Sequence, residues 1–201
     1  MLFETSSERI IDFRDIASKY GWYNSDNFHN YGAFMDYLQR EGFFIAPAST
    51  KYHGAYEGGL YDHSKTVTNC LIDLTEKNNL KWSRPESPFI VGMFHDICKI
   101  DQYIQVPNEE PTPIATGINA FICGTHYEYN PKLIIKGHGS KSVMLLSQFV
   151  NMTEEEIFCI RFHMGAYEKD EWTEFDLAIR KYPNVLWTHM ADMLASKVMD
   201  V

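Results

Sequence analysis

The hexapeptide FHDICK, residues 94–99, contains the His-Asp pair that decides which fold we expect for this chain. His63 precedes the pair, His138 and His163 follow it, and Asp192 closes the series. Each of these residues lies near a segment with helix-like periodicity. Together, four imidazoles and two carboxylates make the ligand set of a site for one or two divalent metal ions.

The chemistry of these ligands narrows the choice of metal and of reaction. Imidazole and carboxylate together suit Mn, Fe, Zn, Ni or Mg better than metals that prefer thiolates. Such an ion lowers the pKa of a bound water from about 15.7 to about 7. Two ions about 3.5–4 Å apart can stabilise both the attacking and the leaving oxygen of an in-line displacement at phosphorus. An Asp next to a His can bridge two ions, because its two oxygens face different directions.

The ordered set resembles the HD-domain metal-dependent phosphohydrolase superfamily. The signature of that superfamily is a His, a His-Asp pair, optional further His residues and a distant Asp. The resemblance covers residues 59–195, and its motifs are GLYDHS (59–64), HDICK (95–99), GHG (137–139), RFHMG (161–165) and AD (191–192). The chain departs from the pattern at Cys98, where many members have Gly, and this bears on substrate approach near Lys99.

The resemblance implies a mainly α fold, an HD-domain helical bundle with a small β-hairpin insert between the His-Asp pair and the third His. It implies that Asp96 is a catalytic residue that bridges two ions. The other metal ligands then fall into two groups, one for each ion: His63, His95 and Asp192, and His138 with His163.

We expect one domain over residues 1–201, because a chain of this length can form a full hydrophobic core. Its core covers about residues 59–200. N-terminal helices and a pocket loop occupy residues 1–58, and a β-insert occupies residues 101–136.

Apolar periodicity and capping signals predict the helices of this domain. We expect them at 8–20 (capped by Ser6 or Ser7), 28–40, from about 60 with His63 on the buried face, 89–96 after Ser87-Pro88, 141–150, from the capping box at Thr153 to about His163, and 184–199. Short apolar runs predict strands at 103–106, 121–123 and 133–135.

Four side chains are candidates for substrate binding. The loop 43–59 is rich in hydroxyl side chains and in Gly and Pro residues that interrupt regular structure. Its Lys51 and His53 could line a pocket. Lys99 lies one turn beyond His95, so it could act in catalysis by binding a phosphate oxygen, or it could neutralise Asp96. His126 could face substrate from the β-insert. For both His53 and His126 the alternative is an ordinary exposed position.

Charge and composition limit the partners. The chain has 18 basic and 27 acidic residues, a net charge of −9, and no cluster of Lys and Arg. A long nucleic acid is therefore an unlikely partner, and a small phosphorylated, nucleotide-like substrate is favoured. No run of 18 apolar residues predicts a membrane span, and the polar, acidic start is unlike a signal peptide. The scattered Cys70, Cys98, Cys123 and Cys159 are typical of reduced thiols, so we expect a cytoplasmic protein.

Three functions fit the sequence. The first is a phosphomonoesterase or phosphodiesterase that acts on a nucleotide or short oligonucleotide through a metal-activated water. The second is a nucleotide-binding sensor module without turnover, although the complete ligand set argues against it. The third is a di-iron oxygenase, because a few relatives in the superfamily cleave C–C or C–P bonds with O₂.

Overall fold

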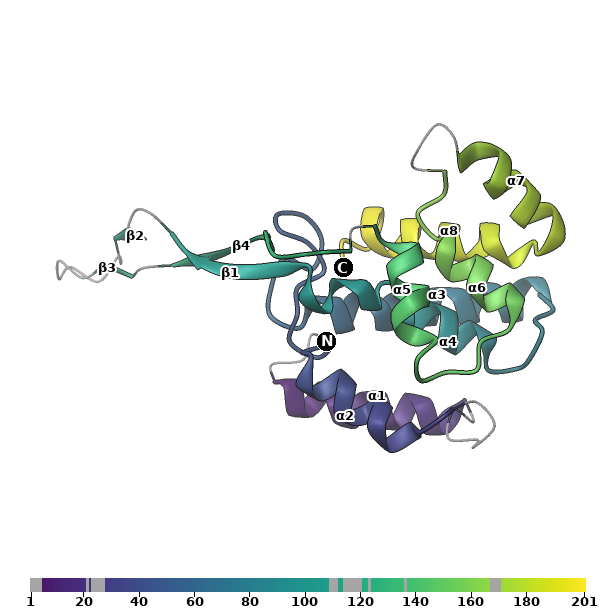
Figure 1. Ribbon diagram of the computed structural model, residues 1–201, viewed down its shortest axis with the longest axis horizontal. Coiled ribbons are helices and arrows are strands. Elements are labelled where there is room, and N and C mark those ends of the chain that lie inside the picture. Colours follow the sequence, from purple (N-terminus) through teal and green to yellow (C-terminus); the bar gives the residue numbers. More distant parts are fainter. Residues whose placement is uncertain are drawn as a thin grey trace.

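The computed structural model describes residues 5–20, 22, 28–108, 112–113, 121–122, 124–135, 137–166 and 171–201. This part of the chain is mainly helical, as the sequence predicts, with small antiparallel β-pairings. The helices gather into one body, and the β-ribbon projects away from it (Figure 1). Among the described residues, no helix combines the length and the apolar character needed to cross a membrane.

The described helices, in chain order, are α1 (Ser6–Lys19), α2 (Tyr31–Arg40), α3 (Gly59–Asn78), α4 (Ser87–Phe94), the 3₁₀ helix η2 (Ile97–Asp101), α5 (Gly139–Leu146), α6 (Glu154–Arg161), α7 (Trp172–Lys181) and α8 (Asn184–Lys197). The strands are β1 (Tyr103–Pro107), β2 (Thr112–Pro113), β3 (Phe121–Ile122) and β4 (Thr125–Tyr129). Helix α7 was not expected from the sequence, because it buries only Phe175 and Ala178.

Two helices begin with a capping box. Thr153 caps α6 as predicted: its side chain accepts a hydrogen bond from the backbone of Glu156, whose carboxylate accepts one from Thr153 in return. Thr5 caps α1 in the same way with Glu8, so the prediction of a cap at Ser6 or Ser7 was wrong. The reason is the spacing, since a box needs an acceptor three residues after the cap.

Helix α3 lies at the centre and packs against α4 and α8. Its buried face includes Leu60, His63, Val67 and Leu71, as the periodicity predicts. Side chains of α1 and α2, such as Phe13 and Phe34, belong to the same hydrophobic cluster. The N-terminal helices therefore share one core with the helices that carry the His-Asp series.

A buried polar network fixes α6 against its neighbours. Glu156 accepts hydrogen bonds from the guanidinium of Arg84 at 2.8 and 2.7 Å and from the Ser87 hydroxyl at 2.8 Å. The prediction that Ser87 caps α4 was therefore wrong. Ser87 is the first residue of α4, and Glu86 stands at the cap position. Glu155 accepts from Asn184 of α8 at 2.8 Å. Because these buried carboxylates are paired, they hold α6 in place without a destabilising unpaired charge.

The β-insert differs in part from the prediction. Strand β1 pairs antiparallel with β4, with Tyr103 opposite Tyr129 and Pro107 opposite Thr125. The predicted strand at 133–135 was wrong, since these residues form an irregular bend. Strand β4 was missed because it is exposed on both faces and so lacks apolar alternation. The expected strand at 121–123 corresponds to β3, which pairs with β2.

The described cysteines Cys70, Cys98 and Cys159 are buried free thiols, as expected. Cys123 lies outside the described residues. Burial raises the pKa of Cys98 to about 12, so this thiol is protonated near neutral pH.

Two glycines allow helices to approach closely next to candidate ligands. A Cβ at Gly92 would lie 2.6 Å from the Cα of Thr68, where α4 crosses α3. A Cβ at Gly139 would overlap the backbone carbonyl of Arg161, where α5 meets α6. The first crossing brings His95 towards His63, and the second brings His138 towards His163.

We predict that Gly92→Ala destabilises the fold, although alanine favours helices. The added methyl would push α4 away from α3, and overpacking of this kind costs about 1–3 kcal/mol. Gly32→Ala in α2 is the matched control, because its Cβ would meet only the Asn30 side chain at 3.6 Å. Urea unfolding measures both variants. If the free energy of unfolding of Gly92→Ala equalled or exceeded that of Gly32→Ala, the close crossing of α3 and α4 would be contradicted.

Candidate metal centre

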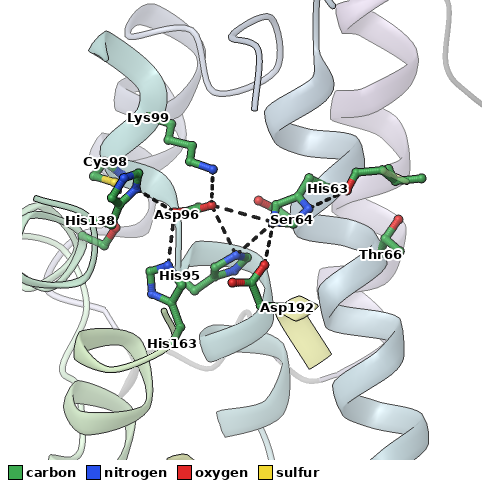
Figure 2. Close-up of polar contacts among 12 residues, drawn as sticks. His63, Ser64, Thr66, His95, Asp96, Cys98, Lys99, His138, His163 and Asp192 are labelled. Carbon is green, nitrogen blue, oxygen red and sulfur yellow. Dashed lines mark hydrogen bonds and ion pairs between the residues drawn. The ribbon is translucent and has the colours of Figure 1, made fainter. Parts of the chain in front are cut away.

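The structure brings all six predicted metal ligands into one cluster, drawn from five places in the chain (Figure 2). Its members are His63 in α3, His95 and Asp96 at the end of α4, His138 immediately before α5, His163 just after α6, and Asp192 in α8. His63, His95 and His163 are fully buried, and Asp96 is only 1% exposed. The cluster is therefore an internal site and not a patch of surface carboxylates.

Helix ends orient two of the imidazoles. Nδ1 of His95 donates to the carbonyl of Gly92, and Nδ1 of His163 donates to the carbonyl of Ile160, both at 2.8 Å. Both carbonyls belong to the last turn of a helix, where carbonyl groups have no partner within the helix. The third imidazole, His63, donates from Nδ1 to the carbonyl of Val201 at 2.8 Å.

These bonds determine the tautomer of each ring. A carbonyl only accepts, so each Nδ1 must carry the hydrogen, and the Nε2 of a neutral ring then presents a lone pair. Burial lowers the pKa of His95 to about 4, which keeps that ring neutral near pH 7. This arrangement, with one nitrogen bound to a backbone carbonyl and the other directed into the cluster, is typical of metal-ligating histidines.

The first group of ligand atoms has the spacing of a coordination shell. Nε2 of His63 lies 3.3 Å from Nε2 of His95 and 3.3 Å from Oδ1 of Asp192. Oδ2 of Asp96 lies 3.7 and 3.5 Å from the same two nitrogens. Four ligands at about 2.0–2.1 Å from one tetrahedral ion lie about 3.4 Å from each other. The four atoms therefore fit around a single ion.

The second group lies on the other oxygen of Asp96. Its Oδ1 is 3.3 Å from Nε2 of His163 and 3.7 Å from Nδ1 of His138. These three atoms are buried and make no hydrogen bond among the described residues. Unsatisfied buried polar atoms are rare, and here they converge. A second cation between them would satisfy all three, so the donor set fits the metal that the sequence predicts.

Lys99 is the one cationic side chain that contacts the cluster among the described residues. Its Nζ lies 2.6 Å from Oδ2 of Asp96, and the residue is only 6% exposed. Burial would raise the pKa of Asp96, but Lys99 and the surrounding histidines together outweigh burial and hold that pKa well below the usual range. Asp96 thus stays ionised. Of the two roles expected for Lys99, the observed contact is the one with Asp96.

Lys51 and His53 line a cavity of about 610 Å³ beside the centre, together with residues of the last turn of α8. The His53 ring packs against the His63 ring, with centroids 5.1 Å apart. Burial and the neighbouring His63 lower the pKa of His53 to about 4. The loop therefore reaches the candidate ligand cluster through His53, whereas Lys51 is an exposed residue of the cavity wall.

The remaining predicted residue, His126, is not brought into the cluster. It lies on β4, in the projecting ribbon, and hydrogen-bonds to Asn108 at 2.8 Å and to Glu128 at 3.1 Å. No local pattern in the sequence predicts that β4 pairs with β1, so the direction of the ribbon could not be predicted.

Several further residues support the cluster. His189 donates to the backbone carbonyl of His163 at 2.7 Å and so supports the helix end that carries this ligand. Cys98 lies near Asp96 and His138. The carbonyls of Gly92 and Ile160 lie three residues before His95 and His163, and this shared i−3 position at a helix end is a signal that could have identified them.

Comparisons with protein-family models, with curated proteins and with solved structures give no match for this chain.

We predict that the folded protein binds divalent metal and is stabilised by it. An ion that binds only the folded state at 100 times its Kd adds about 2.7 kcal/mol. Mn²⁺ or Zn²⁺ should therefore raise the unfolding midpoint of the wild type by several degrees. His95→Ala should abolish the shift, and His126→Ala, on the ribbon, should retain it. Folded wild type with no ion above background in elemental analysis after loading would refute the site.

Proposed function

We propose that this chain is a metal-dependent phosphohydrolase that acts on a small, nucleotide-like phosphoester. The observation that carries the proposal is the buried Asp96 carboxylate, whose two oxygens face two separate groups of ligands. Two adjacent cations with a shared carboxylate suit displacement at phosphorus. The ordered set of residues that resembles the HD-domain superfamily supports the same reaction.

Each group of residues has a distinct task in this proposal. His63, His95 and Asp192 hold one ion, His138 and His163 hold the other, and Asp96 binds both. When bound, such ions lower the pKa of a water and neutralise phosphoryl oxygens. Lys99 keeps Asp96 ionised, and its ammonium adds positive charge beside the position expected for the phosphoryl group.

The exposure of the ligands indicates where a substrate enters. The side chain of His138 is 32% exposed and that of Asp192 is 10% exposed, whereas His95 and His163 have no exposed side-chain surface. Solvent thus reaches the cluster mainly at His138. A narrow approach of this kind suits a phosphate group on a small molecule, and the net charge of −9 disfavours a long nucleic acid.

We predict that Asp96→Asn lowers kcat by at least about 100- to 1000-fold, the effect of removing a major electrostatic contact at a reacting centre. The substitution keeps the side-chain size but removes the charge that both ions share. His163→Ala, which affects one ion, should cost less. The control is Asp73→Asn on the surface of α3, with a side chain that is 64% exposed. A screen of nucleotides, cyclic dinucleotides and short oligonucleotides with metal-loaded protein supplies the assay.

Wild-type turnover in a folded Asp96→Asn variant would end this proposal. Tight nucleotide binding without turnover in the metal-loaded wild type would favour a sensor module instead. Oxygen consumption by the iron-loaded protein, with no phosphate ester cleaved, would favour the oxygenase.

We predict that Lys99→Ala weakens substrate binding while the metals stay bound. Hydrogen bonds to charged groups contribute about 1.5–3 kcal/mol, so KM should rise about 10- to 150-fold. Lys77→Ala is the control, because this lysine is 73% exposed on α3. An unchanged KM would restrict Lys99 to its contact with Asp96.

A further inference from the structure

A cavity of about 310 Å³ lies at the base of the β-ribbon and reaches the metal centre at His138. We call it the Tyr129 cavity. Its lining residues come from the end of η2, the end of β4, the bend that follows and the start of α5: Gln102, Tyr129, Asn130, Pro131, Leu133, Ile135, Gly137 and His138. Its volume is at the lower end of the range for small-ligand pockets.

The wall of this cavity is aromatic and aliphatic. Tyr129, Pro131, Leu133 and Ile135 line it, and no Lys, Arg, Asp or Glu does so among the described residues. The cavity beside His53 is different, because Lys51, Lys197 and Asp200 line it. Two cavities of unlike chemistry therefore flank the metal centre, one on the His138 side and the other on the His63 side.

The wall of the Tyr129 cavity is held in place before any ligand binds. Tyr103, the first residue of β1, lies opposite Tyr129, the last residue of β4. Their rings meet edge to face, with centroids 5.2 Å apart. The backbone N–H of Asn130 donates to the carbonyl of Gln102 at 2.9 Å, and the Asn130 side chain donates to the carbonyl of Asp101 at 2.9 Å. A preformed wall lowers the entropic cost of binding.

Gln102 places a polar group in this wall, beside the polar residues Asn130 and His138. Gln102 is 7% exposed, and its Nε2 donates to the Tyr103 hydroxyl at 3.0 Å. Its side-chain oxygen makes no hydrogen bond within the described residues, so it can accept one from a ligand. An aromatic face beside an amide acceptor is the chemistry that recognises a heteroaromatic ring with an amino group.

We infer that the Tyr129 cavity binds the nucleobase of the substrate and so places the attached phosphate beside His138. This inference rests on the proposed function and names the group that its substrate carries. The ring stacks on Tyr129, the aliphatic side chains enclose it, and Gln102 accepts from its exocyclic amine. The bend 130–135 and the ribbon thus determine specificity, whereas the helices hold the metals.

Calorimetric titration of the metal-loaded protein with adenosine, guanosine, cytidine, uridine and ribose tests the inference. None of these probes carries a phosphate, so their binding does not depend on turnover. At least one amino-bearing nucleoside should bind, and ribose should not. Tyr129→Ala should weaken that binding about 5- to 100-fold, the usual effect of losing one stacking face. Tyr129→Phe should retain it, which also separates loss of stacking from loss of the fold.

The matched controls come from the same bend. Ile135→Ala removes part of the wall and should weaken binding, whereas Ile134 is 96% exposed and does not line the cavity, so Ile134→Ala should have no effect. Absence of nucleoside binding, or equal binding in wild type and Tyr129→Ala, would overturn the inference. Hydrolysis of p-nitrophenyl phosphate or its diester, measured separately, tests the proposed function. Ester hydrolysis without nucleoside binding would refute only the cavity, and nucleoside binding without hydrolysis only the phosphohydrolase.

Discussion

The carboxylate of Asp96 is the group on which the arrangement of the helices depends. It is 1% exposed, and an isolated ionised carboxylate at such a position would be strongly destabilising. Lys99 contacts only one of its oxygens, at 2.6 Å. The other oxygen faces His138 and His163 without a hydrogen bond among the described residues. The fold therefore places a charged group at its centre with one oxygen free to bind the cation that we propose.

Helix ends orient two of the candidate histidine ligands. The unpaired carbonyls at the ends of α4 and α6 fix the rings of His95 and His163. The close crossings at Gly92 and Gly139 bring α4 against α3 and α5 against α6. A backbone acceptor fixes both the rotation and the tautomer of an imidazole, so the nitrogen that faces the centre is set by secondary structure. Rigid elements hold the ligands, while a bend and a ribbon form the cavity beside them.

The sequence predicted the parts that depend on local patterns. The buried face of α3 and the capping box at Thr153 follow from periodicity and cap chemistry. The grouping of the six candidate ligands is what the resemblance to the HD-domain superfamily implies. Strand β4 and the bend at 133–135 could not be predicted in the same way. Strand β4 is defined by its pairing with β1, and Leu133 and Ile135 line a cavity together with residues distant in the sequence, so both features are non-local. The position of His126 was unpredictable for the same reason.

Anomalous diffraction from crystals of the Mn²⁺-loaded protein tests the central claim most directly, because it locates ions independently of activity. The account predicts one peak among His63, His95, Asp96 and Asp192, and a second about 3.5–4 Å away, between Asp96, His138 and His163. Asp96 should then contribute one oxygen to each ion. Absence of any peak inside this cluster in fully loaded crystals, or ions bound only by surface carboxylates, would contradict the account.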